Sequence, residues 1–173
     1  MRDHEAVLDT IVPRDNVYYV YSKGALSLIT TDAAEAVRTA DEEMGVVLNR
    51  SQQYVWERGN RKAQIMLNID DIPYIFRSGV WDEDELKESV GDTMQVLDLS
   101  GCTLDSVLYE VGAQRAVVVK TSADTSQVIL GYDEYNTWLY DPSTKDVSPM
   151  GLNDSTELFE KAGNIFLTYI SSS

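Results

Sequence analysis

Residues 116–142 read AVVVKTSADTSQVILGYDEYNTWLYDP. Three short runs in this stretch are rich in Val, Ile, Leu, Tyr and Trp: Ala116–Lys120, Gln127–Tyr132 and Thr137–Tyr140. Polar residues separate the runs, and Asp133–Asn136 suits a hairpin connection. The pattern predicts a three-stranded antiparallel meander, which ends before Pro142 because proline has no backbone N–H for the ladder.

The segments on either side of the meander extend this prediction. Before it, Met94–Leu99 is expected to be extended and to lead into a helix whose apolar residues, from Leu104 to Val111, recur with helical spacing. After it, Ser143–Gly151 is expected to be a loop. A short helix at Ser155–Ala162 and a last strand at Asn164–Ile170 follow. Strands mixed with packed helices predict an α+β fold.

The N-terminal part reads as a separate small lobe. Residues 1–16 are a lead-in, and residues 17–62 follow a strand, strand, helix, strand, strand pattern. We expect Asp32 to cap the helix and Gly45 to end it. The buried face of this helix is predicted to consist of Ala33, Ala36, Val37 and Ala40. The sequence therefore predicts a ββαββ lobe at 17–62 and a second domain at 63–173.

Two short motifs in the meander resemble those of a bacterial C39-like peptidase domain, a papain-like fold. In that family a strand opens on the catalytic histidine and runs into a Gly-Tyr-Asp turn. The next strand ends at an Asp-Pro whose aspartate orients the histidine. Here Gly131-Tyr132-Asp133 and Asp141-Pro142 stand in that order, and the resemblance covers roughly Leu99–Ile170. It implies a papain-like C-terminal part with Asp141 in the orienting position.

The other catalytic groups of the family are not matched. Counted back from Gly131, the histidine position falls at about Thr125 or Ser126, whereas the one histidine of the chain is His4. The one cysteine, Cys102, falls on a later helix than the family's nucleophile. A helix N-terminus lowers the pKa of a thiol, so Cys102 is an alternative nucleophile, although it lacks a base. We therefore expect no peptidase activity.

Aromatic residues are frequent along the predicted strands and mostly serve as core and cross-strand pairs. Some of them can line a groove, and Tyr132, Asp133, Tyr135 and Trp138 are our candidate ligand-binding residues. One cysteine and one histidine argue against a zinc site. The sequence has no phosphate-binding glycine loop or dinucleotide fingerprint, so neither a metal nor a cofactor is expected.

The chain is strongly acidic. Its 173 residues include 29 Asp and Glu against 14 Lys and Arg, a formal net charge of −15. Such a charge repels nucleic acid and anionic lipid, so neither is an expected partner. No apolar run reaches the length of a membrane span, and we recognise no signal-peptide core at the N-terminus.

The first hypothesis is a non-catalytic C39-like module with a binding or scaffolding role. The resemblance alone implies a larger exported or cell-surface bacterial protein, and a cytoplasmic location stays open. Its partner is expected to be a peptide, a glycan or another domain of the parent protein. The alternatives are a cysteine peptidase that uses Cys102 and a purely structural domain without a ligand.

Overall fold

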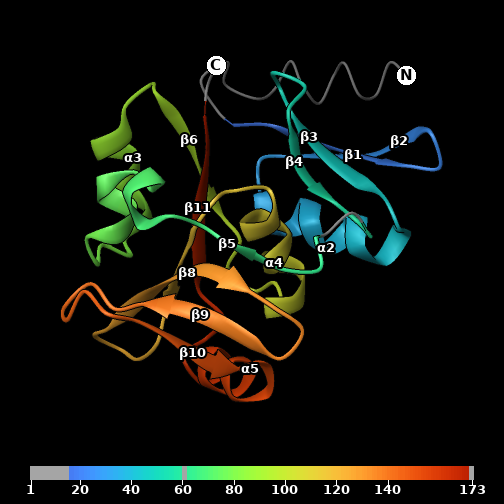
Figure 1. Ribbon diagram of the computed structural model, residues 1–173. Coiled ribbons are helices and arrows are strands. Elements are labelled where there is room, and N and C mark those ends of the chain that lie inside the picture. Colours follow the sequence, from blue (N-terminus) through green and yellow to red (C-terminus); the bar gives the residue numbers. More distant parts are fainter. Residues whose placement is uncertain (1–15, 60–61, 172–173) are drawn as a thin grey trace. The chain divides into compact units, whose positions relative to one another are not determined.

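The computed structural model describes residues 16–59 and 62–171. The chain separates into two compact units, Met1–Gly59 and Asn60–Ser173. Each unit contains an antiparallel sheet with helices packed on it (Figure 1). The predicted α+β class is therefore confirmed.

The first unit is a four-stranded sheet with one helix. Its elements are β1 (Tyr18–Ser22), β2 (Ala25–Thr30), α2 (Ala33–Glu43), β3 (Val46–Asn49) and β4 (Tyr54–Glu57). The strands pair antiparallel in the order β2-β1-β3-β4. The ββαββ pattern of the N-terminal lobe is confirmed by this order of elements.

The ends of α2 are set by local chemistry. The Asp32 side chain accepts the Glu35 backbone N–H at 3.1 Å, which is the predicted N-cap. Met44 is the left-handed residue that ends the helix, with a φ of 57°, so the prediction of Gly45 as the stop residue is wrong. Gly45 is required for space instead, because a Cβ there would collide with the Tyr21 carbonyl oxygen.

The predicted apolar face of α2 is buried. Ala33, Ala36, Val37 and Ala40 are at most 5% exposed, and the helix packs on β1, β2 and β3 of its own unit. Small alanine side chains allow a helix to approach a sheet closely. The face is therefore part of the core of the first unit.

The second unit is built on a seven-stranded antiparallel sheet, with strand order β10-β9-β8-β7-β11-β6 and β5 paired to β8. Its strands are β5 (Ile65–Met66), β6 (Met94–Asp98), β7 (Val117–Lys120), β8 (Ser126–Tyr132), β9 (Asn136–Tyr140), β10 (Val147–Gly151) and β11 (Phe166–Ser171). The meander prediction is confirmed, because β7, β8 and β9 are neighbours. Figure 1 shows β8, β9 and β10 side by side.

The prediction of a loop over Ser143–Gly151 is wrong in its second half. Val147–Gly151 forms the edge strand β10, which pairs with β9 from Val147 opposite Tyr140 to Gly151 opposite Asn136. Pro149 lies within this strand, and an edge strand tolerates a proline because one side of its ladder is unpaired.

Helical segments cover both faces of this sheet. They are η1 (Ile69–Asp71), η2 (Tyr74–Arg77), α3 (Glu83–Val90), α4 (Leu104–Gly112) and α5 (Leu152–Lys161). On one face, Phe76 and Leu86 pack in a cluster with Val118 and Val128, and the Phe76 and Tyr169 rings are 4.5 Å apart. α4 packs against β7 and β8. All of Val117–Val119 are buried, as expected for a strand covered on both faces.

Candidate functional site

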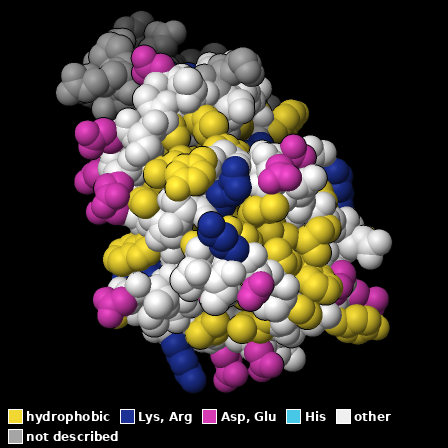
Figure 2. All heavy atoms as spheres, turned by 60° about the vertical axis from the view of Figure 1, so that its left-hand side comes forward, with side chains coloured by type: hydrophobic (Ala, Val, Ile, Leu, Met, Phe, Trp, Pro, Cys, Tyr) yellow, Lys and Arg dark blue, Asp and Glu magenta, His cyan; other side chains and the backbone are white. Residues whose placement is uncertain are grey.

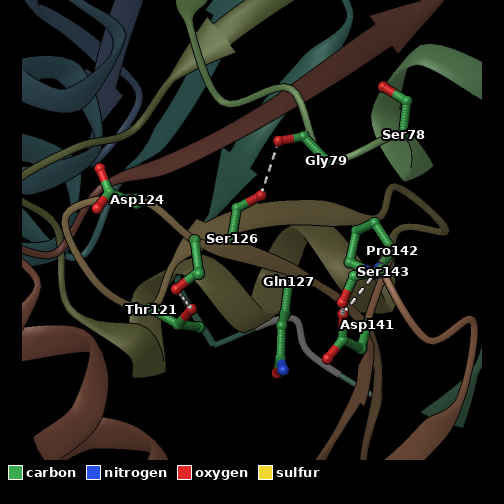
Figure 3. Close-up of a pocket in the computed structure, with 10 residues that line it drawn as sticks. Ser78, Gly79, Thr121, Asp124, Ser126, Gln127, Asp141, Pro142 and Ser143 are labelled. Atoms are coloured by element: carbon green, nitrogen blue, oxygen red, sulfur yellow. Dashed lines mark hydrogen bonds between the residues drawn. The ribbon is translucent and has the colours of Figure 1, made fainter.

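A cavity of about 370 Å³ lies in the second unit where β8 begins and β9 ends (Figure 3). Four segments meet there: the residues after η2, the β7–β8 loop, the start of β8 and the turn after β9. The residues that line it are Ser78, Gly79, Thr121, Asp124, Thr125, Ser126, Gln127, Asp141, Pro142 and Ser143. We call this cavity the Asp141 cleft.

Strand register brings Gln127 beside Asp141. Val128 pairs with Tyr140 across the β8–β9 ladder, so the next residues along, Gln127 and Asp141, also face each other. The Ser143 hydroxyl and backbone N–H donate to Asp141 Oδ1 at 2.7 and 2.9 Å. The two hydrogen bonds from Ser143 lower the pKa of Asp141, and the bond from its hydroxyl has the larger effect. The nearby Gln127 side chain makes a smaller contribution in the same direction. Asp141 is therefore a hydrogen-bonded carboxylate in the cleft.

The positions where the histidine was expected carry hydroxyl groups that bond to their neighbours. Thr125 Oγ1 lies 2.7 Å from Thr121 Oγ1 and 2.6 Å from Ser122 Oγ. Ser126 Oγ donates to the Gly79 carbonyl at 2.9 Å (Figure 3). Both residues line the Asp141 cleft, but neither can accept a proton from a thiol at neutral pH.

Gly79 closes one side of the cleft. Its φ of +97° lies in the left-handed region that favours glycine, and a Cβ there would lie 3.4 Å from Pro142 Cβ. The segment after η2 therefore passes close to the Asp-Pro turn. The Ser126 bond to the Gly79 carbonyl holds the same segment against β8.

The alternative nucleophile lies elsewhere. Cys102 is 2% exposed and precedes Thr103, the N-cap residue of α4, and it is not one of the ten residues that line the Asp141 cleft. His4 lies outside the described residues. Cys102 therefore does not share the cleft with Asp141.

The candidate binding residues occupy the β8–β9 hairpin. Tyr132 is buried and donates its hydroxyl to the Lys62 carbonyl at 2.6 Å. Asp133 Oδ1 accepts the Tyr135 and Asn136 N–H groups, each at 2.8 Å, and Trp138 Nε1 donates to Oδ2 at 3.3 Å. These hydrogen bonds lower the pKa of Asp133, and the bond from the Tyr135 N–H has the largest effect.

Among these hairpin residues only Tyr135 is largely exposed, at 71%. Tyr132 and Asp133 line a second cavity. The structure thus places the predicted set outside the Asp141 cleft.

The Asp141 cleft contains residues that our sequence analysis did not single out. Ser78 and Gly79 come from a segment remote in sequence, and Gln127 was treated only as the start of a strand. Gln127 had a usable signal, because a residue at the start of β8 must face the end of β9 in a hairpin. The exact partner could not be read, since the register shifts between Ile129 and Gly131.

The lining of the cleft is polar. It offers two carboxylates, five hydroxyl groups and the carboxamide of Gln127, and none of the ten described lining residues is Cys, His, Lys or Arg. These groups can donate to and accept from a polar ligand, but they supply neither a thiol nor an imidazole. Across residues 16–59 and 62–171, no group of three or more His, Cys, Asp or Glu is arranged to hold a metal ion.

Acidic side chains are spread over the face shown in Figure 2. They lie mostly toward its edges, with hydrophobic and basic side chains between them. Among the helices in the described part of the chain, none is long and apolar enough to cross a membrane.

Comparison with known proteins gives one structural likeness to report. No protein-family model matches the chain, and no curated protein matches it. A crystal structure from Bacillus anthracis, assigned as a C39-like peptidase, superposes with a TM-score of 0.46 and 18% sequence identity. The match covers 53% of this chain and 57% of that chain, so it spans little more than half of either protein.

Proposed function

We propose that residues 63–173 form a C39-like, papain-like module that binds a peptide in the Asp141 cleft without cleaving it. The order of Gly131-Tyr132-Asp133 and Asp141-Pro142 supports the family, and the cleft beside Asp141 supports a binding role. By the same resemblance, we propose that the module belongs to a larger exported or cell-surface bacterial protein.

The pairing of Gln127 with Asp141 carries this proposal. A papain-like peptidase needs an imidazole beside the acid to activate its thiol. Here the residue of β8 that lies opposite Asp141 at the end of the ladder is Gln127, whose carboxamide has no basicity at neutral pH. An amide therefore lies beside the acid, and no imidazole is among the residues that line the cleft.

A peptide suits the cleft because the lining offers both donors and acceptors. The Gln127 carboxamide can donate to a C=O group of an extended backbone, and the hydroxyl oxygens and carboxylates can accept its N–H groups. A cysteine peptidase that uses Cys102 has less support, because that thiol is buried away from the cleft. A glycan ligand, or no ligand at all, is an outcome that the experiment must distinguish.

The proposal is tested by NMR with the ¹⁵N-labelled full chain. We would add a mixture of short peptides, and in a second titration a mixture of oligosaccharides. Peptide binding should shift the amide signals of Thr125, Gln127 and Ser143. Thr125→Trp should fill the cleft and abolish these shifts, whereas Ser148→Trp, an exposed position on β10 outside the cleft, should leave them unchanged.

Other outcomes would contradict the proposal in different ways. Shifts caused only by the oligosaccharides would replace the peptide with a glycan. An absence of shifts with both mixtures would favour the purely structural alternative. Equal loss of binding in Thr125→Trp and Ser148→Trp would mean that the ligand does not occupy the Asp141 cleft.

A further inference from the structure

The second unit has another cavity, of about 480 Å³, that shares no residue with the Asp141 cleft. It is bounded by the start of α4, the β8–β9 hairpin, the start of α5 and the segment at Lys62 and Ala63. We call it the Leu108 cavity. We infer that it binds a lysine or arginine side chain of a peptide partner.

The inner part of the Leu108 cavity is apolar. Leu104 and Leu108 are 4% and 2% exposed and belong to the packed side of α4, and half-buried Leu152 contributes from the start of α5. Leucine side chains offer contact to methylene groups but no hydrogen bond. This surface therefore matches the aliphatic stem of a long basic side chain, which buries its methylenes and keeps its charge in water.

The rim of the cavity is acidic. Asp105, Asp133 and Glu134 contribute three carboxylates, while Lys62 contributes the one cation, so the formal charge of the lining is −2. A cationic head group above an apolar floor meets both features, whereas a purely apolar side chain would meet only the apolar one. The complementarity therefore selects a basic side chain over an aliphatic one.

Hydrogen bonds hold the walls of the cavity in place. The Tyr132 hydroxyl donates to the Lys62 carbonyl at 2.6 Å, which fixes the outer segment against the hairpin. The Leu152 N–H donates to the Tyr135 carbonyl at 2.9 Å, which ties the start of α5 to the same hairpin. A wall that is already ordered loses little freedom when a ligand binds.

The experiment uses two acetylated tetrapeptide amides, Gly-Leu-Arg-Gly and Gly-Leu-Gln-Gly, titrated into the ¹⁵N-labelled full chain. The arginine peptide should shift the amide signals of Leu108, Tyr132 and Thr156, and it should bind more tightly than the glutamine peptide. Because one solvent-exposed ion pair is at stake, we expect a difference in affinity of about two- to fivefold.

Three variants separate the cavity from general charge attraction. Glu134→Lys reverses an exposed rim charge and should lower the affinity for the arginine peptide by about two- to fivefold or more. Glu157→Lys makes the same change on α5, next to Thr156 but outside the cavity lining, and should have a smaller effect. Ala63→Trp adds a ring at an exposed lining position and should block binding of both peptides.

The inference is overturned if the two peptides bind equally, if neither binds, or if the shifts map only to Thr125 and Gln127 and leave Leu108, Tyr132 and Thr156 unchanged. It is also overturned if Glu157→Lys lowers the affinity for the arginine peptide as much as Glu134→Lys does. Binding at the Asp141 cleft is read separately, from the signals of Thr125 and Gln127, because the two cavities share no lining residue.

Discussion

Gly131, the glycine of the Gly-Tyr-Asp turn, is predicted to be irreplaceable because β5 passes over it. A Cβ at this position would lie 2.7 Å from the Ile65 carbonyl oxygen and 2.8 Å from the Met66 sulfur. Both distances are well inside the optimal separation of about 3.5–4 Å. The methionine side chain can move, but the Ile65 carbonyl belongs to the β5–β8 pairing. Gly131→Ala must therefore displace β5.

Overpacking of this kind costs about 1–3 kcal/mol. With a urea m-value of about 2 kcal/mol/M, the unfolding midpoint should fall by roughly 0.5–1.5 M. The assay is urea unfolding followed by circular dichroism and by tryptophan fluorescence. Gly151→Ala is the matched control, because its nearest atom, Asp154 Oδ2, would lie 3.8 Å from the new Cβ. We expect that variant to stay within about 0.5 kcal/mol of the wild type.

The two glycines thus give opposite predictions for one substitution. A Gly131→Ala midpoint equal to that of the wild type would refute the packing explanation, because β5 would have moved without cost. A loss of equal size in Gly151→Ala would attribute the effect to glycine replacement in general.

Two further predictions concern ionisable groups. In a His4→Asn background, Gln127→His should place an imidazole beside Asp141 and raise its pKa from about 6.5 to roughly 7; an NMR titration checks this, and added Asp141→Asn should return the value to about 6.5. The second concerns Glu110, which is fully buried and forms an ion pair with Arg115 at 2.8 Å; burial raises its pKa to about 7, against a smaller opposing effect of Arg115. Because its pKa is raised in the folded state, its contribution to stability is present in full below about pH 4.5 and is lost as the pH rises through about 7. Relative to the wild type, Glu110→Gln should therefore gain up to about 3 kcal/mol of unfolding free energy from pH 4.5 to pH 8. The exposed control Glu157→Gln should show no such trend. A difference in unfolding free energy between Glu110→Gln and the wild type that does not change with pH would contradict the raised pKa.

Local chemistry explains which parts of the fold were predictable. In the Asp133–Asn136 connection, the Asp133 side chain accepts the N–H groups of the residues two and three positions ahead. Because all partners lie within four consecutive residues, this interaction can be predicted from the local sequence. The Asp32 cap of α2 is local in the same way. The alternating and continuous apolar runs of the meander likewise identify strands before their partners are known.

The parts that failed depend on distant partners. The bond from Ser126 to the Gly79 carbonyl joins residues 47 positions apart, so no window along the chain contains it. The partner of Asp141 depends on the register shift between Ile129 and Gly131, which moves every later pairing by one residue. In the described sheet, strand β10 pairs with β9 alone, and Pro149 argues against a strand locally. The polar cleft was therefore not predictable as a unit, although several of its residues were named.

Mass spectrometry tests most directly whether the Asp141 cleft binds peptides without cleaving them, as we propose. A broad peptide library is incubated at neutral pH with the pure full chain and with its Cys102→Ala variant. We predict that no peptide is cleaved by either protein, because the residue beside Asp141 is Gln127 and not a histidine, and Cys102 is buried outside the cleft. Cleavage by the wild type that disappears in Cys102→Ala would contradict the account.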